Sequence, residues 1–364
     1  MKVPFVDIGL QYNKLRKQIL NKFDQLSKKG EYVLGEELQK FEEEFAKYCG
    51  TKYAVGVGNG SDALTFSLLS LNIGLNDEVI IPANSFIATA WTVANVGAKP
   101  VFVDVLEDYN IDPKEIKKKI SKKTKAIIPV HLTGNMARMS EILKIAKEYN
   151  LKIIEDAAQA VGASINRKKA GSFGELGCFS LHPLKNLHVH GDGGVITTNN
   201  LKLYNFLKKI RNHGLKNRDE LEFWGYNSRL DNIQAAIARI KLKHLDKWNK
   251  RFNFIASKYS KKLSKKIHTP IVDKKNFSIF HRYIIMVDNR DILQRYLINN
   301  GIETKVNYPI PLHLQKASKN LYYKKGSLPI VEKQALKILS LPIYPDLANE
   351  KIDYVIKKIN NFYS

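Results

Sequence analysis

A short apolar run that ends in two acids, Leu151-Lys152-Ile153-Ile154-Glu155-Asp156, says more about the architecture of this chain than any other segment. Its two isoleucines predict a buried strand. In a parallel sheet such a strand delivers its last residue to the carboxyl edge, which is where open α/β sheets bind their ligands. Asp156 therefore stands at a position that suits a site residue.

Similar strand-like segments recur on both sides of this run, with helical intervals between several of them. Helical patterns cover residues 61–71 and 86–96. The predicted strands are residues 53–57, 78–82, 100–105, 126–131, 151–155, 177–181 and 195–198. This alternation predicts an α/β fold, with a mostly parallel sheet covered by helices.

A long helical pattern begins near residue 228 and links this sheet to a second lobe. The second lobe has a strand-like segment at residues 283–287 and a helical one at residues 291–299. We expect residues 1–240 to form a large domain and residues 241–364 to form a smaller α+β domain.

Composition narrows the class of protein. The net charge is +24, but the lysines are scattered and no motif that reads nucleic acid is present, so we expect anionic small ligands and no nucleic acid. The sequence shows no signal peptide and no apolar run long enough to cross a membrane, which favours a cytoplasmic protein. Cys49 and Cys178 lack metal-ligand spacing, so both are expected in the core and no metal site is indicated.

Lys185 stands on a predicted short loop between two strands, after residues 177–181 and before a glycine turn at residues 191–194. A primary amine paired with a buried acid is what pyridoxal phosphate chemistry needs. The amine forms a Schiff base with the aldehyde, and the acid keeps the pyridine nitrogen protonated. We therefore predict that Lys185 and Asp156 are catalytic residues of a pyridoxal phosphate enzyme. The alternative is that Lys185 is one solvated charge among 59 lysines and arginines.

Six segments, in this order and spacing, resemble the DegT-type (DegT/DnrJ/StrS) nucleotide-sugar aminotransferases, which are pyridoxal phosphate enzymes of fold type I. They are residues 58–64, 85–89, 129–134, 155–160 (Glu155-Asp156-Ala157-Ala158-Gln159-Ala160), 179–186 and 225–230. The opening residues 3–7 and the closing residues 341–345 fit as well, so the resemblance covers the whole chain.

The resemblance implies a set of cofactor ligands besides Lys185 and Asp156. Gly60 and Ser61 would bind the phosphate at a helix N-terminus, although Ser61 also reads as an ordinary helix cap. Phe86 would stack on the cofactor ring, Gln159 would hydrogen-bond its phenolic oxygen, and Ser180 would supply a second hydroxyl to the phosphate. The alternatives are a core phenylalanine, a solvent-facing amide and a strand serine.

The family also implies a homodimer with shared active sites, because Asn227 would reach the cofactor phosphate of the neighbouring subunit. Arg229 in the same loop is assigned to substrate binding. From the residues alone, these two are a turn residue and a surface charge at a helix start.

Substrate ligands are implied by the segment at residues 305–315, where Tyr308 and His313 would contact the sugar nucleotide. His190 is a further candidate for the sugar pocket, with a structural histidine as the alternative. Asn307 and Val161 stand where the family commonly has histidine, which leaves the exact sugar open.

The activity implied is transfer of an amino group from L-glutamate to a nucleotide-linked 3-keto or 4-keto sugar, with pyridoxamine phosphate as the intermediate carrier. The amino sugar would enter surface polysaccharide, such as lipopolysaccharide O-antigen, or a glycosylated metabolite. The nucleotide stays open between dTDP, UDP and GDP. One alternative is a sugar dehydratase using the same cofactor, whose relatives carry histidine in place of Lys185. The other is a regulatory protein that keeps the fold without the reaction.

Overall fold

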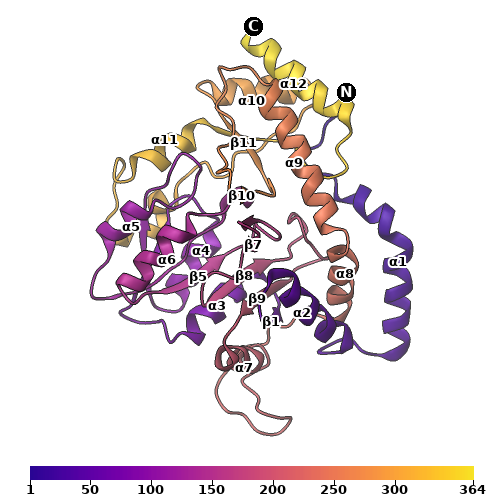
Figure 1. The fold of residues 1–364 in the computed structure, drawn as a ribbon, viewed down its shortest axis with the longest axis vertical. Helices are drawn as coiled ribbons and strands as arrows, with labels where there is room; N and C mark the ends of the chain where they lie inside the picture. Colours follow the sequence, from indigo (N-terminus) through magenta and orange to yellow (C-terminus); the bar gives the residue numbers. More distant parts are fainter.

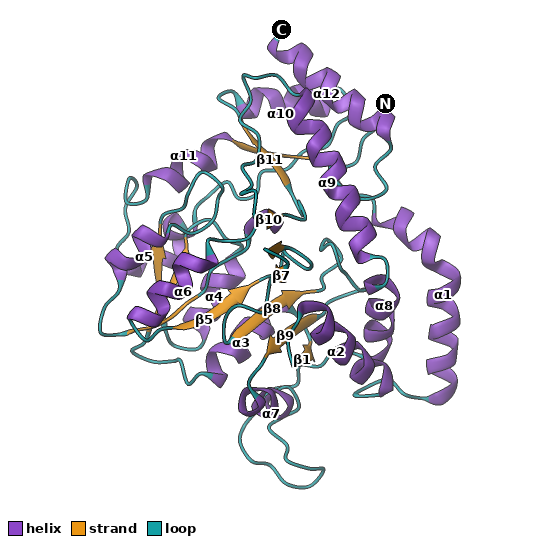
Figure 2. Ribbon diagram, in the orientation of Figure 1, coloured by secondary structure: helices purple, strands orange, loops and turns teal.

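The computed structural model describes residues 1–364 and places a seven-stranded sheet beneath a smaller lobe (Figures 1 and 2). The strands are β1 (Tyr53–Val57), β2 (Glu78–Pro82), β3 (Lys99–Val103), β4 (Thr124–Ile127), β5 (Lys152–Asp156), β8 (Leu176–Ser180) and β9 (Gly194–Thr198). Their order is β1-β9-β8-β5-β4-β2-β3. Only β9 runs antiparallel to its neighbours, so the predicted mostly parallel sheet is confirmed.

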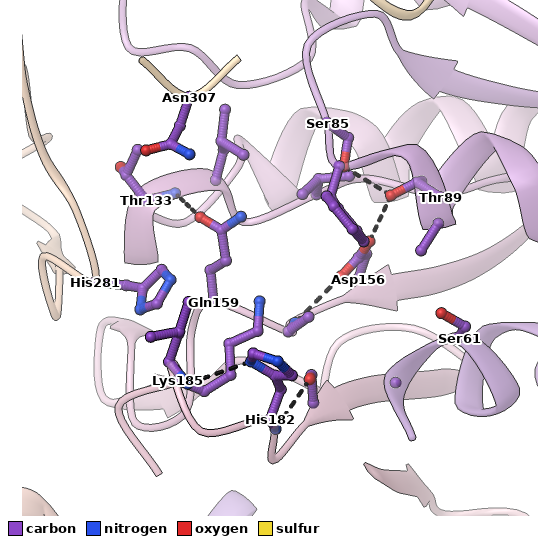
Figure 3. Close-up of a pocket in the computed structure, with 18 of the residues that line it drawn as sticks. Ser61, Ser85, Thr89, Thr133, Asp156, Gln159, His182, Lys185, His281 and Asn307 are labelled. Atoms are coloured by element: carbon purple, nitrogen blue, oxygen red, sulfur yellow. Dashed lines mark hydrogen bonds between the residues drawn. The ribbon is translucent and has the colours of Figure 1, made fainter. Parts of the chain in front are cut away.

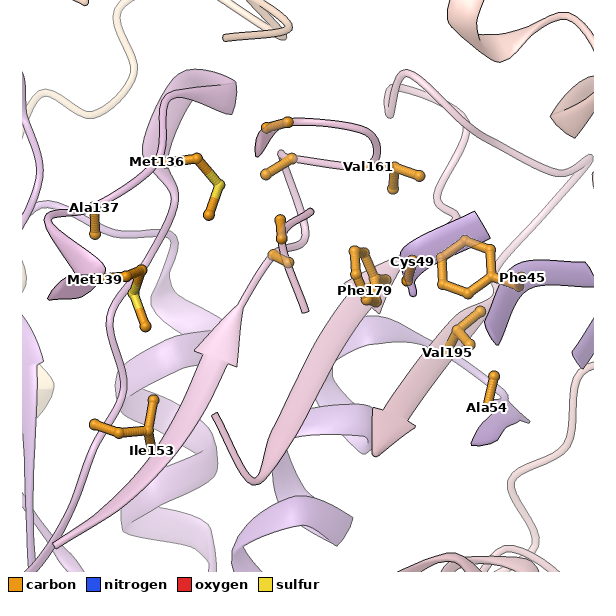
Figure 4. Packing of buried hydrophobic residues seen from close by; sticks show 14 of the residues in the cluster. Phe45, Cys49, Ala54, Met136, Ala137, Met139, Ile153, Val161, Phe179 and Val195 are labelled. Atoms are coloured by element: carbon orange, nitrogen blue, oxygen red, sulfur yellow. The ribbon is translucent and has the colours of Figure 1, made fainter. Parts of the chain in front are cut away.

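Both faces of the sheet are buried, which explains why its strands are short apolar runs rather than alternating ones. Successive residues point to opposite faces. In β2, Val79 and Ile81 join one hydrophobic cluster while Ile80 joins the other. On the face of Ile80, the ring of Phe179 packs edge to face against that of Phe45, with ring centroids 5.0 Å apart (Figure 4).

Helices supply the other half of each cluster. On the face of Phe179 lie α2 (Glu36–Cys49), α5 (Pro113–Lys119), α6 (Met139–Glu148) and α8 (Asn232–Leu242). On the opposite face lie α3 (Gly60–Ser70), α4 (Ile87–Asn95), α7 (Leu201–Ile210) and α11 (Pro329–Lys337). Cys49 and Cys178 are buried in these clusters as free thiols, as expected.

The smaller lobe is built around a two-stranded antiparallel sheet and its own hydrophobic cluster. Its elements are β11 (Tyr283–Met286), β12 (Ile338–Leu341), α9 (Leu245–Lys262), α10 (Arg290–Asn299) and α12 (Asn349–Tyr363). The expected continuous helix from residue 228 is instead two helices, α8 and α9. Leu245 packs in the larger lobe and Phe252 in the smaller one, so α9 connects them.

The N-terminal segment joins the smaller lobe, because Val3 lies in its cluster and pairs with Ile302. We therefore propose that the small domain includes the first residues as well as the predicted 241–364. The remaining elements are α1 (Ile8–Lys29), the three-stranded sheet of β6 (Ser164–Ile165), β7 (Lys168–Lys169) and β10 (Asn276–Phe277), and the 3-10 turns η1 (Leu132–Gly134), η2 (Leu312–Leu314) and η3 (Lys316–Leu321). None of the helices combines the length and apolar character that crossing a bilayer demands.

Candidate active site

A cavity of about 340 Å³ opens at the carboxyl edge of the sheet, between the two lobes. Its walls come from the ends of β5 and β8, the first turns of α3 and α4, and the segment that leads into β11. Lys185, Asp156 and Gln159 all face this space (Figure 3). The sequence prediction that an acid and a lysine meet at this edge is thus matched by the geometry.

Asp156 ends β5 and is only 5% exposed. Its two oxygens accept hydrogen bonds from the Thr89 hydroxyl at 2.8 Å and from the Ala158 backbone N–H at 3.2 Å. Thr89 is itself 2.7 Å from the Ser85 hydroxyl, so a short chain of hydroxyls ends on the carboxylate. Such donors fix the orientation of the carboxylate.

Glu155 points to the opposite side of the strand and holds the structure rather than the site. It is fully buried and accepts from the backbone N–H groups of Gly171, Phe173 and Gly174 at 2.6 to 2.9 Å. It also lies 3.0 Å from His131 Nε2. Successive residues of a strand point to opposite sides, so Glu155 faces the protein interior and Asp156 faces the site.

Lys185 lies on the loop between β8 and β9, as predicted, and this loop is well anchored. Its backbone N–H bonds to the His182 carbonyl at 2.8 Å, and its own carbonyl lies 3.0 Å from His188 Nδ1. Burial lowers the pKa of the Lys185 amine to about 8, the charge of Asp156 opposes this, and Arg282 adds to it. At pH 7 about a tenth of the amine is therefore neutral, and so nucleophilic, which is far more than for a solvated lysine.

An anion cradle lies at the start of α3. Asn59, and not Ser61, caps this helix by accepting from the Asp62 N–H at 2.8 Å, so the Ser61 hydroxyl faces the cavity without serving as the cap. A Cβ added at Gly60 would come within 2.8 Å of the Ser180 Cβ, so only glycine permits this close approach. Free N–H groups, the helix dipole and two hydroxyls converge there.

Gln159, Tyr308 and Phe86 form another part of the wall. The Gln159 oxygen accepts from the Thr133 N–H at 2.9 Å, which turns its amide nitrogen toward the Tyr308 hydroxyl at 3.5 Å. Phe86 is 51% exposed, with its ring centroid 6.0 Å from that of Tyr308. The exposure rules out the alternative of a core phenylalanine.

Four predicted site residues lie outside this cavity. His313 is buried against Glu332, with Nε2 3.0 Å from the carboxylate, so the structure gives it a structural partner instead of a place in the pocket. His190 packs edge-on against the Tyr12 ring at 5.7 Å, which matches the structural alternative. Arg229 donates to Asn212 at 3.2 Å, and Asn227 lies in the same loop.

Several lining residues were missed from the sequence. Ser85 and Thr89 fall within a segment already singled out, and their four-residue spacing on a helix start could have marked them. His182 and Asp192 also line the cavity and fall within quoted segments, at residues 179–186 and in the glycine turn at 191–194. His281 and Arg282 line it as well, but they lie in no segment that the sequence singled out.

A low-pKa lysine, a buried acid with its own donors, an aromatic wall and an anion cradle at one sheet edge together fit pyridoxal phosphate. The amine and the acid face the same cavity, and the cradle lies beside them, as the cofactor's aldehyde, ring nitrogen and phosphate require. Fold and site define a pyridoxal phosphate enzyme of fold type I.

The chain belongs to the DegT/DnrJ/EryC1/StrS aminotransferase family, whose model matches residues 13–360. It is 44% identical over 368 residues to the "Pleiotropic regulatory protein" of Geobacillus stearothermophilus, covering 100% of this chain and 99% of that one. It is 42% identical over 362 residues to the dTDP-3-amino-3,6-dideoxy-alpha-D-galactopyranose transaminase of Aneurinibacillus thermoaerophilus, covering 99% of each.

Solved structures agree with this assignment. DesV of S. venezuelae, solved in complex with a ketimine intermediate, superposes with a TM-score of 0.97 at 39% identity, covering 99% of this chain and 98% of that one. The ntda protein of Bacillus subtilis, solved with bound pyridoxamine phosphate, gives a TM-score of 0.92 at 32% identity, covering 98% of this chain and 84% of that one. The predicted family, fold type and aminotransferase class are confirmed.

Proposed function

We propose that this enzyme transfers the amino group of L-glutamate to a nucleotide-linked 3-keto or 4-keto sugar. The observation that carries the proposal is the meeting of the Lys185 amine, with its pKa near 8, and the buried Asp156 carboxylate in one cavity. The family match and the transaminase named among the relatives support the sugar nucleotide as acceptor. The net charge of +24 favours such an anionic substrate through long-range attraction.

When bound, pyridoxal phosphate supplies an aldehyde and a ring that accepts electrons. Lys185 would hold it through Nζ. When not bonded to that group, the same Lys185 nitrogen would move the proton that leaves the α-carbon of the amino donor. Asp156 would keep a proton on the ring nitrogen, while the backbone around Gly60 and the Ser61 and Ser180 hydroxyls would bind the phosphate. Gln159 and Phe86 would position the ring.

The two alternative functions are disfavoured by Lys185 itself. A dehydratase of this group would carry histidine at that position. A regulatory role is the printed description of one relative, yet the full set of Lys185, Asp156 and Gln159 faces the cavity of this chain. Selection for regulation alone gives no physical reason to keep them together. We place the reaction in the cytoplasm and its product in surface polysaccharide, for instance O-antigen, or in a glycosylated metabolite.

The direct test is to load the purified enzyme with pyridoxal phosphate and add L-glutamate with a panel of dTDP-, UDP- and GDP-linked 3-keto and 4-keto sugars. We expect 2-oxoglutarate and an amino sugar nucleotide in equal amounts for at least one member, detected by mass spectrometry. Conversion of the bound cofactor by glutamate with no sugar product from any member would refute the acceptor assignment.

We also propose a homodimer with shared sites. Trp224 is 89% exposed and Tyr226 is 46% exposed, and both neighbour Asn227 on the loop that follows α7. Exposed aromatic side chains clustered on one loop suit a protein interface. Phe86, which lines the cavity, and Trp91 on α4 are each 51% exposed and add further apolar surface.

Mixed dimers test whether Asn227 acts across that interface. Lys185→Ala and Asn227→Ala chains, each inactive or nearly so alone, should regain about a quarter of wild-type activity when co-expressed, because half of random dimers carry one intact site. The control is co-expression of Lys185→Ala with Asp156→Asn. These two residues belong to the same site of the same chain, so every site of the mixed dimer carries one of the two substitutions. If the Asn227 mixture recovers no more than that control, Asn227 acts in its own subunit.

A further inference from the structure

Arg282 lines the cavity but has no ionic partner. It stands just before β11 and belongs to none of the ion pairs of the chain, unlike Arg211 in its buried pair and Arg239 in its half-buried ones. Its guanidinium lies 4.9 Å from the centre of the Phe5 ring. A guanidinium that stacks on an aromatic ring keeps its N–H groups available for hydrogen bonds. An arginine that lines a cavity in this way ordinarily binds a carboxylate or a phosphate.

The acids near Arg282 are occupied elsewhere. Asp156 accepts from Thr89 and Ala158. A smaller hollow shares Arg282 with the cavity and contains Asp7 and Asp346, but Asp7 caps α1 and Asp346 pairs with Lys14. Asp192 also lines the cavity but is exposed and forms no pair with Arg282. The guanidinium therefore contributes uncompensated positive charge.

Arg282 enters the cavity next to β11 of the smaller lobe, whereas the phosphate cradle is built from the ends of α3 and β8 in the larger lobe. Arg282 is close enough to Lys185 for its charge to act on that amine. An anion held by Arg282 is therefore distinct from the cofactor phosphate and lies beside the reacting nitrogen.

We propose that Arg282 binds a carboxylate of the amino donor, an assignment that rests on the proposed transamination. The donor must bring its amine to the position of Lys185 Nζ. Its α-carboxylate is attached to the same carbon as that amine, so the carboxylate arrives next to Lys185. A planar guanidinium matches a carboxylate with two parallel hydrogen bonds. The diphosphate of a sugar nucleotide is a weaker fit, because at least part of the sugar ring separates it from the reacting carbon.

The test uses the enzyme loaded with pyridoxal phosphate and follows the cofactor absorbance while L-glutamate is added without any sugar. Arg282→Gln should raise the apparent dissociation constant for glutamate about 10- to 100-fold, the range expected for one charge-assisted bidentate contact. Arg282→Lys keeps the charge but loses the fork, so it should fall between. Binding of glutarate, which cannot react, measured by calorimetry should weaken in the same order.

Arg295→Gln is the matched control, because Arg295 is an exposed arginine on α10 and loses the same charge far from the site. Arg295→Gln should leave the apparent dissociation constants for glutamate and for glutarate unchanged. If Arg282→Gln leaves glutamate and glutarate binding unchanged, or weakens only the reaction of the pyridoxamine form with a keto-sugar nucleotide, the carboxylate assignment is overturned and the second result points to the diphosphate. If no sugar of the panel reacts while Arg282→Gln still weakens glutamate binding, only the assignment of the acceptor is wrong.

Discussion

Lys185→Ala should lower turnover by at least about 10,000-fold, because it removes both the covalent tether and the group that moves the proton. No other amine lines the cavity to replace it. The same variant should lose covalent attachment of the cofactor. Borohydride reduction followed by peptide mapping should find the label on Lys185 in the wild-type enzyme and nowhere in the variant.

Lys241 provides a matched control for this experiment. It is a second buried lysine, 1% exposed on α8, and burial lowers its pKa to about 7, yet it does not line the cavity. Lys241→Met should keep the label on Lys185. A label on Lys241, or wild-type turnover in Lys185→Ala, would show that a low pKa rather than placement in the site determines which amine reacts.

Attachment should also depend on pH in a defined direction. Only the neutral amine attacks an aldehyde, and the pKa of Lys185 is lowered to about 8. The initial rate of cofactor capture by the cofactor-free protein should therefore rise about tenfold per pH unit below pH 8 and level off above it. A rate that kept rising to pH 10.5 would mean that the amine behaves as a solvated lysine.

The sheet was predictable because its strands are buried on both faces, so each is a short apolar run with clear ends. The predicted limits of residues 53–57 and 78–82 coincide with β1 and β2. Residues 126–131 were predicted as one strand, but β4 ends at Ile127. The residues beyond it stay buried and hydrogen-bonded to β2 and β5, but only as an isolated bridge between Val130 and Asp156. Pro129 has no N–H to donate, so the regular ladder stops there although the apolar pattern continues.

The site was only partly predictable. The residues that were found lie at the ends of strands, and those that were missed make contacts with residues far away in the sequence. Asp156 and Lys185 could be inferred because each ends or follows a strand at the same edge. Thr89 reaches Asp156 across 67 residues of sequence, and Arg282 enters from the other lobe, so neither contact leaves a local pattern. The role proposed for Asn227 requires a second copy of the chain, so the fold of one subunit provides no contact that supports it.

Asp156→Asn should slow the reaction with glutamate about 1,000-fold while changing cofactor affinity much less, because affinity rests mainly on the separate phosphate cradle. The amide can still accept from Thr89, but its nitrogen is a donor and cannot hold a proton on the ring nitrogen. Single-turnover absorbance kinetics and cofactor titration measure the two effects separately.

Thr89→Val separates the charge of Asp156 from its positioning. It removes the 2.8 Å hydrogen bond to the carboxylate and keeps the acid, so the half-reaction should slow only about tenfold. If Asp156→Asn were no slower than Thr89→Val, the acid would matter for orientation and not for its charge, and the ring nitrogen would need no anionic partner. A rate in Asp156→Asn within threefold of wild type would remove Asp156 from the reaction altogether. The relative rates of the two variants therefore decide whether Asp156 acts through its negative charge or only through its position beside the cofactor.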